Sequence, residues 1–165
     1  MKQIKVQQLS RDAFAKYGTY QNLLDDEDMA LHSINKKGFF CDLIQLDFAD
    51  TTLPSVNCCQ VSKPEKRVIG FIEAHKYTCE GLLPIDSDMV IYVGIYKGEF
   101  QLDSIEAFLI PKGTFVKLNP LIVHGTQYPV NEGISHCLCM LPMRTFNNDM
   151  IAKRLDEEDR IEIVD

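Results

Sequence analysis

Among the four histidines in this sequence, His75 has two carboxylates close by in the chain, so it is the first candidate for chemistry near neutral pH. Glu73 and His75 lie two residues apart in a strand-like segment, so both side chains point to one face, and Glu80 follows five residues later. A carboxylate beside an imidazole can select one tautomer and raise the basicity of the ring. The pair therefore suits acid–base catalysis or metal binding, the alternative being an exposed pair on an edge strand.

His124 is the second candidate, because it follows a turn at Asn119-Pro120 and a short apolar run and precedes Gly125. The apolar run predicts a position near the interior of a β-structure. One interpretation is a catalytic or metal-binding histidine, and the other is a core histidine bonded to a backbone carbonyl. With His75 and Glu80 it makes a sparse but workable ligand set for a divalent transition metal.

Three further side chains have two interpretations each. Lys117 alternates with Phe115, and it either enters the cavity to bind a carboxylate or is solvated. Tyr92 is either a hydrogen-bond donor to a substrate or a packing residue. His136 is either a site residue or a structural one, because the sequence leaves open which face of its strand is the interior. If Cys137 points into the core, His136 points away from it, and we favour the structural interpretation.

The composition excludes several classes of protein. The 165 residues, with 45% apolar and 25% charged residues, predict one globular domain spanning 1–165. A net charge of −7 without a basic stripe argues against nucleic acid as a partner. No apolar run is long enough to span a membrane, and the first residues lack the apolar region of a signal peptide, so we expect a cytoplasmic protein with no membrane partner. Six cysteines without a C-x-x-C pair are expected to be reduced thiols.

The elements that position these residues are predicted to be mostly strands. A helix over Arg11–Tyr17, capped by Ser10, precedes an irregular segment over Tyr20–Leu31. Near the end we expect a helix from Asn148 or Asp149 through Leu155 and a last edge strand at Ile161–Val164. The strands between are separated by turns rich in glycine and proline, at 4–6, 39–48, 56–61, 68–74, 89–96, 107–110, 114–118 and 134–141. Their spacing is typical of an all-β sandwich or barrel.

The order of these motifs resembles the cupin family. Glu73, His75 and Glu80, followed by Gly94, are similar to a degenerate first cupin motif, in which Glu73 stands at a histidine position. The second cupin motif has its counterpart in a series of similar residues in this chain, Pro111-Lys112-Gly113, Asn119-Pro120 and His124-Gly125. The resemblance implies an antiparallel β-barrel (jelly roll) with short N- and C-terminal helices and a site in the barrel mouth.

Within the cupins, the sequence is similar to the ureidoglycolate lyase (ureidoglycolate hydrolase) branch. The similar segments are the opening Val6-x-x-Leu9-Ser10-x-x-Ala13-Phe14-x-x-Tyr17-Gly18, His32-x-Ile34-Asn35-x-x-Gly38, Glu73-x-His75 and Ala107-Phe108-Leu109-Ile110. The resemblance implies a homodimeric lyase of allantoin degradation, in purine catabolism, that releases urea and glyoxylate from a small anionic metabolite. His124, His75 and Glu73 would then be catalytic, and substrate-binding residues would be Lys117, Asn35, His32 and Tyr92.

The departures from that branch leave three functions open. The stretch Gln60–Lys63 has no arginine where the branch has one, and His124 is the one histidine in a segment that is histidine-rich in the branch. The protein is therefore the lyase, a metal-dependent cupin acting on a sugar or keto acid, or a non-catalytic module that binds a small molecule. In the second case His75, Glu80 and His124 hold the metal.

Overall fold

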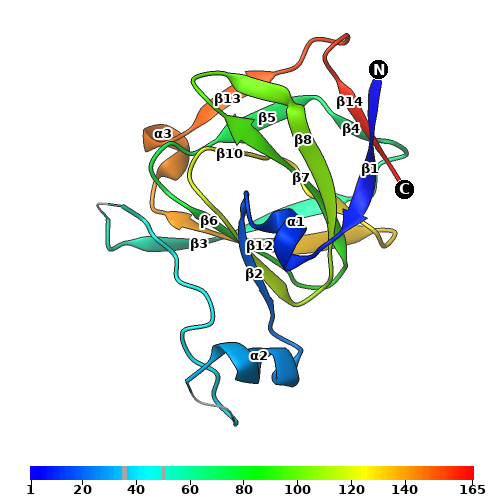
Figure 1. Ribbon diagram of the computed structural model, residues 1–165. Coiled ribbons are helices and arrows are strands. Elements are labelled where there is room, and N and C mark those ends of the chain that lie inside the picture. The colour runs from blue at the N-terminus through cyan, green and yellow to red at the C-terminus, as the bar shows by residue number, and fades with distance from the viewer. Residues whose placement is uncertain (35–36, 50) are drawn as a thin grey trace.

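The structure, a computed structural model, describes residues 1–34, 37–49 and 51–165, and its strands form two main sheets that curl toward each other (Figure 1). The larger sheet contains β1 (Lys2–Gln8), β4 (Arg67–Ile69), β7 (Met89–Tyr96), β8 (Phe100–Ile110), β10 (Ile122–Val123), β11 (Tyr128–Pro129) and β14 (Ile161–Val164). The smaller sheet contains β2 (Gly18–Asn22), β3 (Pro54–Ser62), β6 (Glu80–Pro84), β9 (Thr114–Leu118) and β12 (Ile134–Pro142). A separate ribbon pairs β5 (Phe71–Ala74) with β13 (Ile151–Arg154).

The helices are short: α1 (Arg11–Phe14), α2 (Asp26–His32) and α3 (Thr145–Asn148). The expectation of an all-β, barrel-type fold with short helices is therefore confirmed, and the curled sheets form a half-barrel. The larger sheet is mixed, however, because β1 runs parallel to both of its neighbours, β8 and β14. No helix among the described residues is long and apolar enough to cross a membrane.

Strand β7 lies at the centre of the core, as its uninterrupted apolar sequence predicts. Met89, Ile91 and Val93 pack on one side with residues from the smaller sheet. Val90 and Tyr92 pack on the other side with residues of β4, β5 and β14. Each such buried side chain contributes roughly 1.5–3 kcal/mol to stability. This double burial makes β7 and its neighbours a rigid frame for the segments that carry the histidines.

The last strand is central rather than at an edge, so that expectation was wrong. β14 lies between β1 and β4, and Ile161 and Ile163 are buried. The expected helix from Asn148 or Asp149 was also wrong. The chain there forms β13, because Ile151–Arg154 pairs with β5.

Two further expectations are corrected. The stretch 39–48 contains no strand among its described residues, and its alternation is interrupted at Asp42, which has a positive φ of 59°. The segment Tyr20–Leu31 is not irregular, because it contains the end of β2 and most of α2. α1 is shorter than expected, although Ser10 does cap it by accepting a hydrogen bond from the backbone of Ala13.

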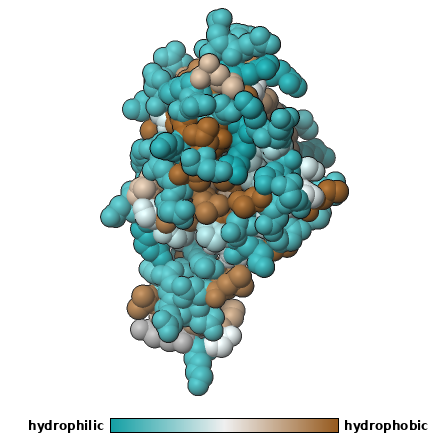
Figure 2. Space-filling model, turned by 90° about the vertical axis from the view of Figure 1, so that its right-hand side faces the viewer, coloured by the Kyte–Doolittle hydropathy of each residue, from teal (hydrophilic) through white to brown (hydrophobic). Residues whose placement is uncertain are grey.

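The face of the molecule turned toward the viewer in Figure 2 is mostly hydrophilic, with apolar side chains gathered across its middle. Below them the molecule narrows to the part that carries α2, which projects from the sheets in Figure 1. The candidate site lies at the other end, where β5, β6 and β10 approach one another.

Candidate metal centre and its cavity

Backbone pairing brings Glu73 and His124 together, although they are far apart in the sequence. The backbone N–H of each donates to the carbonyl of the other, both at 2.9 Å. In such an antiparallel pair the two side chains emerge on the same face. Glu73 Oε1 is consequently 3.8 Å from Nε2 of His124.

His75 and Glu80 lie at the two ends of the turn that joins β5 to β6. Glu80 is paired with Leu118 of β9, so it faces the interior as Leu118 does. Asp149 organises the turn, because its carboxylate accepts hydrogen bonds from the backbone of 76–78 and from the Thr78 hydroxyl. The backbone carbonyl of Asp149 also lies 2.6 Å from Nδ1 of His75. One residue thus fixes both the turn and the ring.

Three buried side chains converge to form a compact centre. Glu80 Oε2 is 3.2 Å from Nε2 of His75 and 2.7 Å from Nε2 of His124. The candidate ligand atoms of the three residues all lie within 4.8 Å of one another. The sequence prediction that His75, Glu80 and His124 form one group therefore agrees with this geometry.

The tautomers of the two rings decide what this centre can hold. Nδ1 of His75 faces the carbonyl of Asp149, and Nδ1 of His124 faces the carbonyl of Ile122 at 2.8 Å. A carbonyl only accepts hydrogen bonds, so each Nδ1 carries the proton and each neutral ring presents a lone pair at Nε2. Both lone pairs then face Glu80, which is itself an acceptor. A cation is required between them, either a proton or a metal ion.

Without a metal, the electrostatics favour a proton on His124. Burial alone lowers the pKa of His124, but the Glu80 carboxylate more than offsets this and raises it to about 9. Burial likewise opposes ionisation of Glu80, but His124 and His75 lower its pKa to about 2. Even so, Nε2 of His124 lacks a well-directed hydrogen-bond partner among the described residues. The short contact is therefore poorly shaped for a hydrogen bond.

The donor set fits a divalent transition metal. Two imidazole nitrogens and one carboxylate suit zinc, iron, manganese or nickel. Each ring is oriented through its other nitrogen by a backbone carbonyl, as is usual for metal-binding histidines. The poorly partnered Nε2 of His124 would be satisfied by such an ion.

A cavity of about 410 Å³ adjoins the centre. Glu73 and Glu80 lie on its wall, and no lysine or arginine does so among the described residues. Burial raises the pKa of Glu73, and Glu80 adds to this effect against the opposing influence of His124. The rest of the wall combines amide, hydroxyl, thiol and apolar side chains with Gly125: Asn57, Cys59, Gln60, Val61, Phe71, Thr126, Gln127, Cys139 and Phe146.

Gly125 is needed beside this cavity for steric reasons. A β-carbon at this position would lie 2.0 Å from the hydroxyl oxygen of Tyr92. That hydroxyl is committed to the carbonyl of Phe71, to which it donates at 2.6 Å. Tyr92 is thus a buried residue behind the cavity wall, and its predicted contact with a substrate is not supported by its position.

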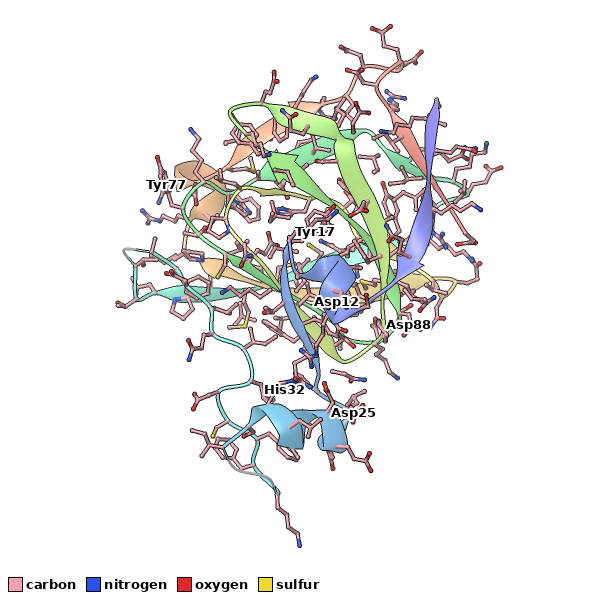
Figure 3. The ribbon with its side chains drawn as sticks, in the orientation of Figure 1. Asp12, Tyr17, Asp25, His32, Tyr77 and Asp88 are labelled. Atoms are coloured by element: carbon pink, nitrogen blue, oxygen red, sulfur yellow. The ribbon has the colours of Figure 1, made fainter. Side chains whose placement is uncertain are left out.

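Lys117 and His32 lie apart from the centre. Val116 and Leu118 of β9 are buried, so Lys117 between them points to the outer face of the smaller sheet. It lines a separate open pocket together with His32 and Arg11. Figure 3 shows His32 on α2 at the bottom of the molecule and Tyr77, two residues after His75, near α3. Asn35 lies outside the described residues.

Two remaining sequence interpretations agree with the structure. His136 precedes the buried Cys137 on β12 and points to the other face of that strand, where it is half-exposed, with Nδ1 2.6 Å from Asp86. All six cysteines are free thiols. Asp149, by contrast, was missed as a site residue, because the sequence interpretation made it a helix cap and nothing in its neighbourhood indicates the turn at 76–78.

No protein-family model matches the chain, and no curated protein matches it. Among solved structures, RmlC from Streptococcus suis, described in complex with dTDP-D-xylose, is similar, with 11% sequence identity and a TM-score of 0.40. The match covers 55% of this chain and 44% of that chain.

Proposed function

We propose that this protein binds a divalent transition metal through His75, Glu80 and His124 and acts on a small molecule in the adjoining cavity. One observation carries the proposal. Two imidazole lone pairs and a carboxylate face one another in a buried space, with both Nδ1 atoms already committed to carbonyls. Burying three such groups together is costly unless a cation joins them.

A metal at this centre would supply Lewis acidity to an oxygen atom of the substrate. Glu73 is the residue placed to move a proton, because it lies on the cavity wall beside His124. Its raised pKa brings it closer to neutrality, where a carboxyl group exchanges protons most effectively. The amides of Asn57, Gln60 and Gln127 supply hydrogen bonds that orient polar groups of the substrate.

A sugar or keto acid is the substrate class that this cavity favours. Among the residues that the structure describes, the cavity wall has amides and two phenylalanines, Phe71 and Phe146, and it lacks lysine and arginine. Hydroxyl and carbonyl groups match the amides, and the aromatic side chains offer apolar contact. A multiply charged anion would be bound here only through the metal.

Ureidoglycolate lyase activity is the second candidate, and the pairing of Glu73 with His124 favours it. That reaction needs a base to take the hydroxyl proton and an acid to protonate the departing nitrogen. Glu73 and the two histidines would share these tasks. Lys117 lies elsewhere, so the substrate carboxylate would be held without it. Incubation of the protein with ureidoglycolate tests this reaction, and glyoxylate release at the spontaneous rate excludes it.

Metal analysis tests the primary proposal. The purified protein is loaded separately with Mn²⁺, Fe²⁺, Co²⁺, Ni²⁺ and Zn²⁺, desalted and measured by elemental mass spectrometry. We expect about one ion per chain, lost in Glu80→Gln and retained in the surface control His136→Gln. A folded wild-type protein that retains none of these ions contradicts metal binding. A metal-bound protein that binds ligands but turns over neither a sugar or keto acid nor ureidoglycolate is a binding module instead.

A further inference from the structure

A pair of thiols lies on the wall of the same cavity, and the proposed chemistry does not use it. Cys59 belongs to β3 and Cys139 to β12, and their sulfur atoms are 3.5 Å apart. The antiparallel register places Cys137 opposite Cys59 and Cys139 opposite Asn57. Cys59 and Cys139 are therefore diagonal neighbours on the inner face of the smaller sheet.

The spacing suits a bridging atom better than a direct disulfide. Diagonal neighbours across a sheet have their α-carbons about 7–8 Å apart, whereas a disulfide needs roughly 4.4–6.8 Å. Closing a disulfide between Cys59 and Cys139 would therefore require movement of the backbone. Two sulfurs bound at about 2.3 Å to one pyramidal centre, with an angle of about 100° between the two bonds, are separated by about 3.5 Å. The observed separation is close to that value.

The environment keeps both groups as thiols that a soft ligand can reach. The neighbouring Cys139 thiol and burial raise the pKa of Cys59, and a hydrogen bond with Cys137 and burial raise that of Cys139. Thiols of this kind react slowly with reagents that require a thiolate. Both nevertheless line the cavity, and Cys59 is partly exposed.

We propose that Cys59 and Cys139 form a dithiol site for a soft, thiophilic ligand of the trivalent arsenical class. In the hydrated arsenical, arsenic carries two hydroxyl groups. Each thiol forms one arsenic–sulfur bond, one arsenic–oxygen bond breaks for each, and the thiol proton leaves with the hydroxyl as water. No atom changes its oxidation state. The ligand occupies the cavity beside Glu73 and Glu80, so it competes with any substrate bound there.

The experiment uses phenylarsine oxide on the reduced, folded, full-length protein. Intact-mass spectrometry should find one phenylarsenic unit bound per chain, with the loss of two thiol protons, and a small competing dithiol should remove it. Cys59→Ser and Cys139→Ser should each lower the affinity at least tenfold. Cys58→Ser is the matched control and should bind as the wild type does, because Cys58 is exposed and is the chain neighbour of Cys59.

Two results would overturn the proposal: no adduct on the wild-type protein, or equal binding by Cys59→Ser. Circular dichroism establishes that each variant is folded. If Cys139→Ser, which changes a buried residue, fails to fold, the partly exposed Cys59 decides the question. Metal content is measured on the same samples and should be unchanged in Cys59→Ser, which separates this site from His75, Glu80 and His124.

Discussion

His124 and His136 each lie against a carboxylate at similar distances, 2.7 Å from Glu80 and 2.6 Å from Asp86, but in opposite surroundings. The side chains of His124 and Glu80 are only 4% and 7% exposed, whereas those of His136 and Asp86 are 39% and 42% exposed. Water screens the outer pair, His136 and Asp86, so their contact contributes little to the stability of the fold. The inner pair lacks that screening and needs a cation. Burial, rather than contact distance, thus distinguishes a candidate site from a surface ion pair.

The largest expected effect comes from removing the inner carboxylate. Glu80→Ala leaves two imidazoles without their partner, and breaking a buried pair in this way costs about 3–5 kcal/mol. Asp86→Ala, the outer counterpart, should leave the midpoint of urea denaturation unchanged within error. Urea denaturation of both metal-free variants measures this difference. Equal destabilisation by the two substitutions would contradict the comparison.

The second effect concerns Asp149, which is not part of the metal centre but holds the His75 ring and the turn after it in place. Asp149→Ala removes the acceptor of the hydrogen bonds from 76–78 and loosens the turn that carries His75. Loss of a residue that supports a metal ligand typically weakens metal binding about 10–100-fold. Calorimetric titration of the metal-free protein with Co²⁺ measures this loss of metal affinity. Asp149→Asn serves as a matched variant that should retain part of the affinity, since its one remaining oxygen still accepts.

The third effect is a pH dependence that belongs to the inner pair alone. The pKa of His124 rises from 6.5 to about 9 on folding, so its contribution is present below pH 6.5 and is lost as the pH rises through 9. The pKa of Glu80 falls from 4.5 to about 2, so its contribution is present above pH 4.5 and is lost as the pH falls toward 2. Metal-free protein should therefore lose stability between pH 6.5 and 9.

Glu80→Gln is the control for that pH profile, because it removes the carboxylate that raises the pKa of His124. Its stability should be lower at pH 6.5 and should no longer fall toward pH 9 through His124. Thermal denaturation of both proteins across this range gives the comparison. A parallel decline in the two proteins would assign the loss to other groups.

The smallest expected effects come from substitutions away from the metal centre, at His136 and in the outer pocket that Lys117 lines with His32 and Arg11. Lys117→Ala should change neither the metal content nor the turnover of any substrate found for the cavity, because Lys117 points to the other face of β9. His136→Gln should be equally silent. A tenfold loss of turnover in Lys117→Ala would mean that the substrate extends to the outer pocket.

The sequence predicted the residues of the candidate metal centre better than the residues that hold them in place. Strand alternation put Glu73 and His75 on one face, and the apolar run before His124 placed it near the interior. The same alternation left the direction of Lys117 open, because only tertiary packing shows which face of β9 is buried. Asp149 could not be recognised, since its partners are the backbone groups at 76–78, far away in the sequence.

The fold was predictable to a similar extent. Regular strands such as Met89–Tyr96 follow from their own residues. The stretch 39–48 looks equally strand-like, but Asp42 turns the chain and no neighbouring strand pairs with it among the described residues. β13 was missed for the opposite reason, because its four residues become a strand only by pairing with β5. Long-range pairing thus decided the segments that short-range patterns left ambiguous.

Nitrogen-15 NMR of the histidine rings tests the central claim most directly. The metal-free protein is titrated with Zn²⁺ while the Nε2 and Nδ1 resonances are followed. The account predicts that Nε2 of His75 and of His124 shift on saturation with one ion per chain, while both Nδ1 atoms stay protonated and His136 is unchanged. Unchanged resonances of His75 and His124 at saturating Zn²⁺, or a shift confined to His136, would contradict it.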